Sequence, residues 1–455
     1  EWADKLFAWL AADGQQPEYR VKGLSGQAWS QYKSGKMEEA AVTFGRLLDA
    51  SPPSKLAAEG ALVRGQILQQ LGRLDAALEM FDLVIKKYSQ TDRYPEALWA
   101  AARIRDDRGE DREAAGLYER LANEFPDFPE ADAVLYRWGW TLADLGEQDR
   151  FYALLERLTK NYPQSTFRAD AVFRLAQHAY ETSQLADARR WVDSLLSGEP
   201  AEAVRGSGIR ENALYLRAQI DVAEARWPEA QRGFEEMLAQ YPEGPLRQRA
   251  EYGVAEAAFR QGRYEEARER LGRLAQQTEG KQEPWLAVVQ LRLAQTLCHE
   301  KKWNEAYDVA SKIESQYPGF EEQFEADYVT GRCLANRADF DGAREAYGKV
   351  IRSARGEKTE TAAKAQLMIA ESYFHQENHE AALREFLRLE ILYAYPELQS
   401  AALMQAAKCH ELLGEVPQAT ELYQRLVKSY PETEFAAAAA NRLDAPHSPA
   451  AKPGP

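Results

Sequence analysis

Cysteine is scarce in this chain. Only Cys298, Cys333 and Cys409 occur among 455 residues, and these scattered thiols lack the even pairing with which small secreted domains build a disulfide framework. All three fall in segments that we expect to be helical, so we predict buried structural thiols. Such scarcity is consistent with either the cytoplasm or the periplasm.

Long apolar runs are also missing. No stretch approaches the length of about 20 apolar residues that a membrane-spanning helix needs, so we predict no direct membrane span. No secretory leader is visible, and the chain begins with Glu1 rather than Met, a start that a cleaved leader or a trimmed chain would each give. The net charge of −15 and the pI near 5.2 argue against nucleic acid or an anionic membrane as the principal ligand. An acidic balance is equally typical of an ordinary soluble surface.

Motifs for catalysis are absent from the sequence as well. It has no phosphate-binding glycine loop, no nucleophile elbow and no paired zinc motif. Cysteine-histidine pairs such as Cys298-His299 are neighbours, and neighbours on a helix point about 100° apart. His375 and His379 are four residues apart, but His379 falls beyond a predicted turn. We therefore expect a non-enzymatic protein with no catalytic residue, no cofactor and no metal site.

The sequence does contain a repeat. One position, which we call the anchor, returns at intervals of 37, 39 or 42 residues and is alanine in ten of its eleven occurrences. A period of this length is typical of a solenoid built from helix pairs, in which each unit packs only on its neighbours. The anchors are Ala40, Ala77, Ala114, Phe151, Ala188, Ala230, Ala267, Ala306, Ala343, Ala382 and Ala419.

Four more positions recur around the anchor. The residue twelve before it is Ala or Gly in every unit, which suits two closely packed helices, because a bulky side chain there would overpack by about 1–3 kcal/mol. Glycine is frequent five before it, where it can end the first helix in the left-handed conformation. A large residue four after it should pack against the next unit. Proline twelve after it is common and separates the units.

These residues resemble the tetratricopeptide repeat, from about residue 21 to residue 432. The resemblance implies an all-α fold, a right-handed superhelical solenoid of about eleven helix–turn–helix repeats. Tyr-Pro endings such as Tyr162-Pro163, and the run Ala171–Ala176, are similar to those of bacterial cell-envelope repeat proteins. These are the Tol–Pal-associated periplasmic coordinator and the repeat lipoprotein of the outer-membrane β-barrel assembly complex.

The predicted domain division follows the repeat. The longest interval, from Ala188 to Ala230, places a longer loop at 197–210, which is either a hinge or a tolerated insertion. The first residues are either a half repeat, because Ala3 lies 37 residues before Ala40, or a capping helix. The predicted segments are 1–17 (half repeat or N-terminal capping helix), 18–200 (array units 1–5), 201–432 (array units 6–11), 433–444 (C-terminal capping helix) and 445–455 (disordered Pro/Ala tail).

The resemblance also suggests where a partner would bind. In this family the first helices line a concave groove, and we expect the positions fifteen and eleven before the anchor to reach it. Aromatic side chains there supply contact area, and Gln, Arg and Glu can bond an extended backbone; the alternative is that the aromatic residues pack between helices. The family's Lys/Asn clamp for a C-terminal carboxylate is not present, which disfavours a chaperone-tail ligand. The candidates are Trp29, Gln66, Trp99, Arg103, Tyr136, Trp140, Phe173, Gln177, Tyr215, Tyr252, Glu256, Tyr328 and Arg332.

The resemblance implies a scaffold for protein–protein interaction. We expect the chain to hold a protein or peptide partner in the groove, as part of a multi-protein assembly associated with the bacterial envelope, in the periplasm or at the outer membrane. A cytoplasmic location is the alternative. Two other functions remain open: the regulatory or substrate-recruiting part of a larger enzyme, and a scaffold for polysaccharide export.

Overall fold

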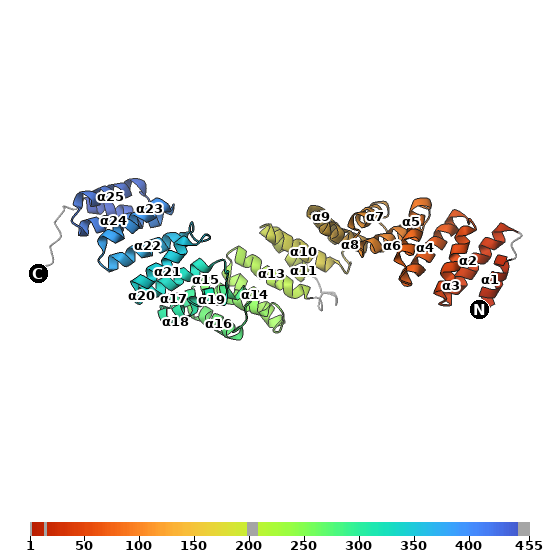
Figure 1. Cartoon of the computed structure of the whole chain (residues 1–455), viewed down its shortest axis with the longest axis horizontal. Coiled ribbons are helices and arrows are strands. Elements are labelled where there is room, and N and C mark those ends of the chain that lie inside the picture. Colours follow the sequence, from red (N-terminus) through yellow and green to blue (C-terminus); the bar gives the residue numbers. More distant parts are fainter. Residues whose placement is uncertain (1, 13–15, 198–207, 445–455) are drawn as a thin grey trace. The chain divides into compact units, whose positions relative to one another are not determined.

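A computed structural model describes residues 2–12, 16–197 and 208–444. Within these ranges every regular element is an α-helix, and the helices follow one another in antiparallel pairs (Figure 1). The described ranges hold eleven such pairs, one for each anchor, together with one further helix at each end. The all-α repeat architecture expected from the sequence is therefore confirmed.

The first helix of each pair carries the small residue that lies twelve positions before the anchor. These helices are α2 (Pro17–Lys33), α4 (Ser54–Gln70), α6 (Tyr94–Asp106), α8 (Ala131–Asp144), α10 (Arg168–Glu181), α13 (Ile209–Ala223), α15 (Arg247–Arg260), α17 (Leu286–His299), α20 (Gln323–Asn336), α22 (Glu360–His375) and α24 (Pro396–Leu412).

The second helix of each pair carries the anchor. Ten of them are continuous within the described residues, and the eighth is divided into α18 and α19. The second helices are α3 (Met37–Asp49), α5 (Leu74–Lys87), α7 (Asp111–Glu124), α9 (Gln148–Asn161), α11 (Leu185–Ser197), α14 (Trp227–Gln240), α16 (Tyr264–Gln277), α18 (Trp303–Ala310) with α19 (Ile313–Gln316), α21 (Phe340–Arg352), α23 (His379–Leu392) and α25 (Val416–Ser429).

One helix lies before the first pair and one after the last. Helix α1 (Trp2–Ala12) packs against α2, and α26 (Glu434–Asp444) packs against α24 and α25. The face of α1 that carries Trp2 and Trp9 is open to solvent, with 78% and 62% of these side chains exposed. The predicted tail at 445–455 lies outside the described residues.

The chain forms two compact units, one ending at Leu216 and the other beginning at Arg217. This boundary falls inside α13. Most of the loop predicted at 197–210, including the predicted division between 200 and 201, lies outside the described residues. Whether that loop is a hinge or an insertion stays a prediction.

The turn between the two helices has the same backbone conformation in every repeat. The residue five before the anchor has a positive φ in all eleven, between 55° and 79°. Six are glycines, such as Gly72, and five are not: Ser183, Ala225, Lys301, Ala338 and Glu377. The next amide donates back into the first helix, as Arg73 N does to Leu68 O at 2.8 Å. This is the left-handed helix ending that glycine adopts at no steric cost.

The core is built from the small residues predicted to meet. Every anchor is buried, and so is every residue twelve before it. Gly65 shows why bulk is excluded, because a Cβ placed on it would lie 2.5 Å from Cε1 of Phe81, the large residue four after the anchor. Phe44 instead approaches Gly60 of the next repeat. The large residue therefore packs against both its own repeat and the next.

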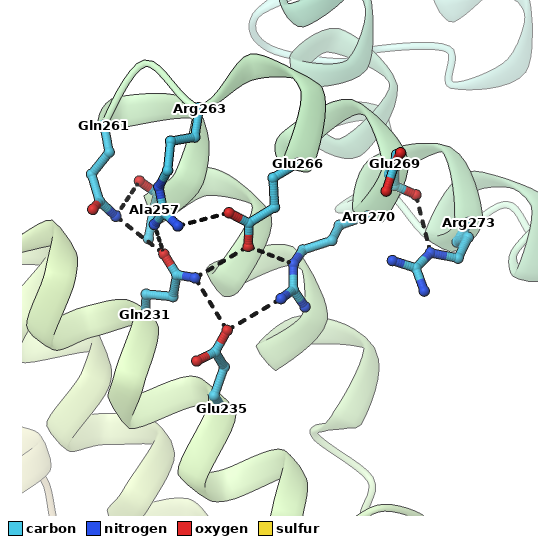
Figure 2. A network of polar contacts seen from close by, with 9 residues as sticks. All are labelled: Gln231, Glu235, Ala257, Gln261, Arg263, Glu266, Glu269, Arg270 and Arg273. Atoms are coloured by element: carbon cyan, nitrogen blue, oxygen red, sulfur yellow. Dashed lines mark hydrogen bonds and ion pairs between the residues drawn. The ribbon is translucent and has the colours of Figure 1, made fainter.

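Polar side chains also join consecutive second helices, as between α14 and α16. Gln231 of α14 is buried, and its Nε2 donates to Glu235 Oε1 at 3.1 Å and to Glu266 Oε1 of α16 at 3.2 Å (Figure 2). Arg270 Nη2 reaches Glu235 Oε1 at 3.2 Å, and Arg263 Nη1 reaches Glu266 Oε2 at 2.7 Å. This network ties the sixth repeat to the seventh by hydrogen bonds to charged groups, which are stronger than neutral ones.

Candidate functional site

Ten of the thirteen candidate residues lie in pairs on the first helices. Positions fifteen and eleven before the anchor are four residues apart, so they stand one above the other on the same helix face. The guanidinium of Arg103 lies 5.5 Å from the ring centre of Trp99 on α6, and the rings of Tyr136 and Trp140 on α8 are 6.2 Å apart. In both pairs the two side chains lie close together, as a four-residue spacing on a helix requires.

Contacts between neighbouring first helices extend this row in the first unit. Tyr136 of α8 donates its hydroxyl to Asp170 Oδ2 of α10 at 2.9 Å, and its ring stacks on Phe167 at 4.5 Å. Arg174 of α10 lies 5.3 Å from the ring centre of Trp140. Burial raises the pKa of the Tyr136 hydroxyl above its usual range. The aromatic residues therefore contact neighbouring helices while each keeps part of its surface open.

A hollow of about 470 Å³ lies where three of the predicted residues meet. Trp99 and Arg103 line it from α6, and Gln66 lines it from α4. The loop before α8 closes its other side with Phe128, whose ring is 6.3 Å from that of Trp99. The hollow thus combines two aromatic rings with an amide and a guanidinium, an apolar lining with a few polar groups that is typical of binding pockets.

Arg103 contributes to this hollow a buried polar atom that has no acceptor among the described residues. No hydrogen bond or ion pair joins Arg103 to another residue in the part of the chain that the structure describes, and its Nε is buried without an acceptor. Two other charges at the rim are paired: Glu96 with Arg93 at 2.7 Å, and Asp92 with Lys55 at 3.9 Å. A buried donor without an acceptor costs free energy, and a carboxylate or carbonyl of a bound partner would supply the acceptor.

The candidates in the second unit are engaged more fully. Glu256 of α15 is only 8% exposed. Its Oε1 accepts from Arg260 Nε at 2.8 Å, and its Oε2 pairs with Arg292 of α17. Tyr252 donates its hydroxyl to Glu256 Oε2 at 3.4 Å, and burial raises the pKa of Tyr252. Both carboxylate oxygens of Glu256 are therefore occupied from within the protein.

Arg332 of α20 lines a second hollow, of about 310 Å³. Phe340, Glu371 and His375 line it as well. Burial raises the pKa of the Glu371 carboxyl, and His375 stacks on Phe340 at 6.0 Å. Tyr328, one turn before Arg332, packs against Tyr347 at 5.7 Å instead.

The remaining candidates lie apart from these hollows. Trp29 makes edge contacts with Phe44 and Tyr32, at 5.8 and 5.7 Å. Phe173 packs with a small apolar cluster that includes Val172 and Leu195. The last two candidates, Gln177 on α10 and Tyr215 on α13, are half-buried.

Several residues that line the hollows lie in loops and not at the positions fifteen and eleven before the anchor. The loop before α8 contributes Phe128, Pro129 and Glu130. The second Phe-Pro dipeptide of that loop is the sequence feature that could have indicated them. A further hollow of about 490 Å³ is lined by Trp285, Tyr317 and other residues of two loops in the second unit. Both cases show that the turns between repeats add to the surface of the first helices.

The structure can also be compared with the predictions that the chain has no membrane span and no metal site. Over the described ranges, no helix combines the length and the apolar character needed to cross a membrane. In the same residues, no group of three or more His, Cys, Asp or Glu side chains is placed to hold a metal ion. His375 ends α22 and His379 begins α23, on opposite sides of the turn.

Solved structures with similar folds include a tetratricopeptide repeat protein from Parabacteroides merdae, at 14% identity and a TM-score of 0.39 over 61% of this chain and 98% of that chain. PilF of Pseudomonas aeruginosa matches at 13% identity and a TM-score of 0.40 over 51% and 97%. MamA of Desulfovibrio magneticus RS-1 matches at 17% identity and a TM-score of 0.34 over 44% and 99%. Likeness at this level supports no functional argument. No curated protein matches the chain.

Family models match most of the array. A tetratricopeptide repeat-like domain matches residues 209–368. Tetratricopeptide repeat models match residues 25–95 and, in three further copies, residues 96–127, 133–165 and 401–433. Together with the helix pairs and their shared turn, these matches show that the chain belongs to the tetratricopeptide repeat proteins.

Proposed function

We propose that this chain is a scaffold that binds an extended segment of a partner protein along the surface of its first helices. The hollow around Trp99 and Arg103 is the anchoring point of that surface. The observation that carries this proposal is the unpaired guanidinium of Arg103, held over an aromatic ring inside a hollow of about 470 Å³.

The chemistry of the hollow favours a particular kind of contact. An apolar or aromatic side chain of the partner would pack between Trp99 and Phe128, and an adjacent backbone carbonyl or carboxylate would accept hydrogen bonds from Arg103. Gln66 offers an amide that can donate to and accept from an extended backbone. A buried aromatic and arginine anchor of this kind commonly supplies most of the binding energy at an interface.

We further propose that the partner belongs to a multi-protein assembly of the bacterial cell envelope, in the periplasm or at the outer membrane. The support is the sequence resemblance already described, namely the Tyr-Pro endings such as Tyr162-Pro163 and the run Ala171–Ala176.

Site-directed photocrosslinking tests both parts of this proposal. A photoreactive residue at position 100, where Ala100 lines the same hollow and Arg103 stays in place, should capture a defined envelope protein from native membrane and periplasmic fractions. The same residue at position 112, which is exposed on the second helix α7, should not capture it. Equal capture from both positions would refute the anchoring point, and capture of cytosolic proteins alone would refute the envelope location.

A further inference from the structure

Cys298 of α17 and Cys333 of α20 are in contact. Their Sγ atoms are 3.6 Å apart, both thiols are free, and both side chains are almost fully buried. The prediction of buried thiols is confirmed, but the description of the cysteines as scattered is wrong for these two. Only Cys409, on α24, stands without another cysteine beside it among the described residues.

The repeat explains this contact. Cys298 lies eight residues before its anchor, and Cys333 lies ten before the next one. The same two positions meet in the first unit, where Thr141 Oγ1 donates to Asp106 Oδ1 at 3.1 Å across the same separation of 35 residues. The two sulfur atoms are therefore brought together by the regular packing of consecutive first helices.

The second helix beside this pair is unusual. Helix α18 ends at Ala310, four residues after the anchor Ala306, whereas the other ten repeats carry Phe, Tyr, Leu or Val at that position. Ala306 and Ala310 belong to the same buried cluster as Cys298 and Cys333. The eighth repeat therefore has a smaller side chain at this position, in the cluster that holds the thiol pair, than any other repeat.

We propose that Cys298 and Cys333 are a modification site: they form a disulfide when the protein meets a peroxide, and this bond fastens the first helices of the eighth and ninth repeats to each other. Closure needs the sulfur atoms to approach from 3.6 Å to about 2.05 Å. This inference does not depend on the proposed partner binding.

The order of the chemical steps follows from the surroundings of the two thiols. The hydrogen bond between the two thiols and the nearby positive charge of Arg332 lower the pKa of Cys298, whereas the same hydrogen bond, together with burial, raises the pKa of Cys333. The thiolate is the nucleophile in such oxidations, so Cys298 reacts first.

Atoms and electrons balance in two steps. The Cys298 thiolate attacks one peroxide oxygen, the O–O bond breaks, and the sulfur becomes a sulfenic acid while the departing hydroxide takes up a proton to form water. The Cys333 sulfur then gives up its proton and attacks the Cys298 sulfur. The S–S bond forms, the S–O bond breaks, and the second hydroxide leaves with that proton as water. Two electrons pass from the thiols to the peroxide.

Thiol counting on the full chain tests this proposal. The protein is reduced, freed of reductant, treated with hydrogen peroxide, quenched with catalase, unfolded in guanidinium and alkylated. We expect three alkylated cysteines before treatment and only Cys409 afterwards. A peptide pair joined through Cys298 and Cys333 should appear, lighter by two hydrogens than the separate peptides, and dithiothreitol should reverse the change. Three free thiols after treatment, or an over-oxidised Cys298 without a bridge, would overturn the proposal.

Matched variants separate the pair from the remaining cysteine. Cys409 occupies the same position in its repeat as Cys333, ten before the anchor, but the position that would face it in the preceding repeat is Phe374. C409A should therefore still lose two thiols on treatment, whereas C298A should lose none to a bridge. Oxidation should raise the melting temperature of the wild type by roughly 3–6 °C and leave that of C298A unchanged. An equal rise in both proteins would contradict the bridge.

Discussion

Gly139 lies so close to Phe151 that a Cβ on Gly139 would be 3.3 Å from Phe151 Cδ2. Phe151 is the one anchor that is not alanine, and the residue opposite it is a glycine rather than an alanine. The two residues compensate for each other's size across the contact between α8 and α9.

Gly139→Leu should therefore destabilise the array. A leucine side chain at this contact overpacks it, and we expect the free energy of unfolding to fall by about 1–3 kcal/mol, measured by urea denaturation. Gly116→Leu on α7 is the matched control, because nothing lies within 4 Å of a Cβ at that position. An unchanged stability of the Gly139 variant would refute the packing register.

The shared turn predicts an opposite effect at another position. Ala338 has a φ of 59°, a conformation that costs an L-residue about 1–2 kcal/mol. Glycine avoids this cost but has more entropy in the unfolded chain, so we expect Ala338→Gly to stabilise the protein by about 0.5–1 kcal/mol. Gly72→Ala should lower stability by a similar amount, since only its φ of 74° opposes a side chain there. Equal stability of the wild type and both variants in urea would show that the turn conformation is not fixed.

Two tyrosines at the same repeat position should respond differently to loss of the hydroxyl. Tyr118 donates its hydroxyl to Asp106 Oδ2 at 3.1 Å, whereas the hydroxyl of Tyr347 is buried without a partner among the described residues. Tyr118→Phe should therefore cost about 1–2 kcal/mol of unfolding free energy, and Tyr347→Phe should be neutral or stabilising. Thermal denaturation of both variants decides this, and a larger loss in the Tyr347 variant would contradict the hydrogen-bond assignment.

Stability should depend on pH through Glu371. Burial raises its pKa in the folded protein above the ordinary value of 4.5, so the folded state binds this proton more tightly than the unfolded chain. The carboxyl thus favours folding at acidic pH, and that contribution is lost as the pH rises from the ordinary value through the raised one.

Glu371→Gln removes this titration. The stability of the variant relative to the wild type should therefore increase between pH 4 and pH 7, as followed by the urea midpoint. Glu380→Gln, on the exposed surface of α23, is the control and should not show this trend. A constant difference between Glu371→Gln and the wild type would indicate that the carboxyl keeps its ordinary pKa.

Much of the fold could be predicted from the sequence because each repeat obeys the same packing constraint. Small residues at the anchor and twelve before it mark the contact between the two helices, and the position five before the anchor marks the turn. Glycine occupies that turn in only six repeats, yet Ser183 and Lys301 adopt the same positive φ, because the helices on either side impose the backbone path.

The candidate sites were only partly predictable, because some of their residues lie outside the positions that recur along each helix. Spacing along one helix placed Trp99 beside Arg103, but the hollow also needs Phe128 from a loop whose path no periodicity describes. The contact of Cys298 with Cys333 depends on how far consecutive first helices are shifted along each other. A spacing of 35 residues indicates a contact only when that shift is known from the structure.

The central claim, that the surface of the first helices binds a partner, is tested most directly by affinity. The protein captured from position 100 should be titrated with the wild type, with Arg103→Ala plus Trp140→Ala, and with Arg112→Ala, while circular dichroism confirms equal helicity. We predict that the double variant loses at least about tenfold in affinity, equivalent to about 1.4 kcal/mol, and that Arg112→Ala binds as the wild type does. Undiminished binding by the double variant would contradict the account and place the partner elsewhere on the protein.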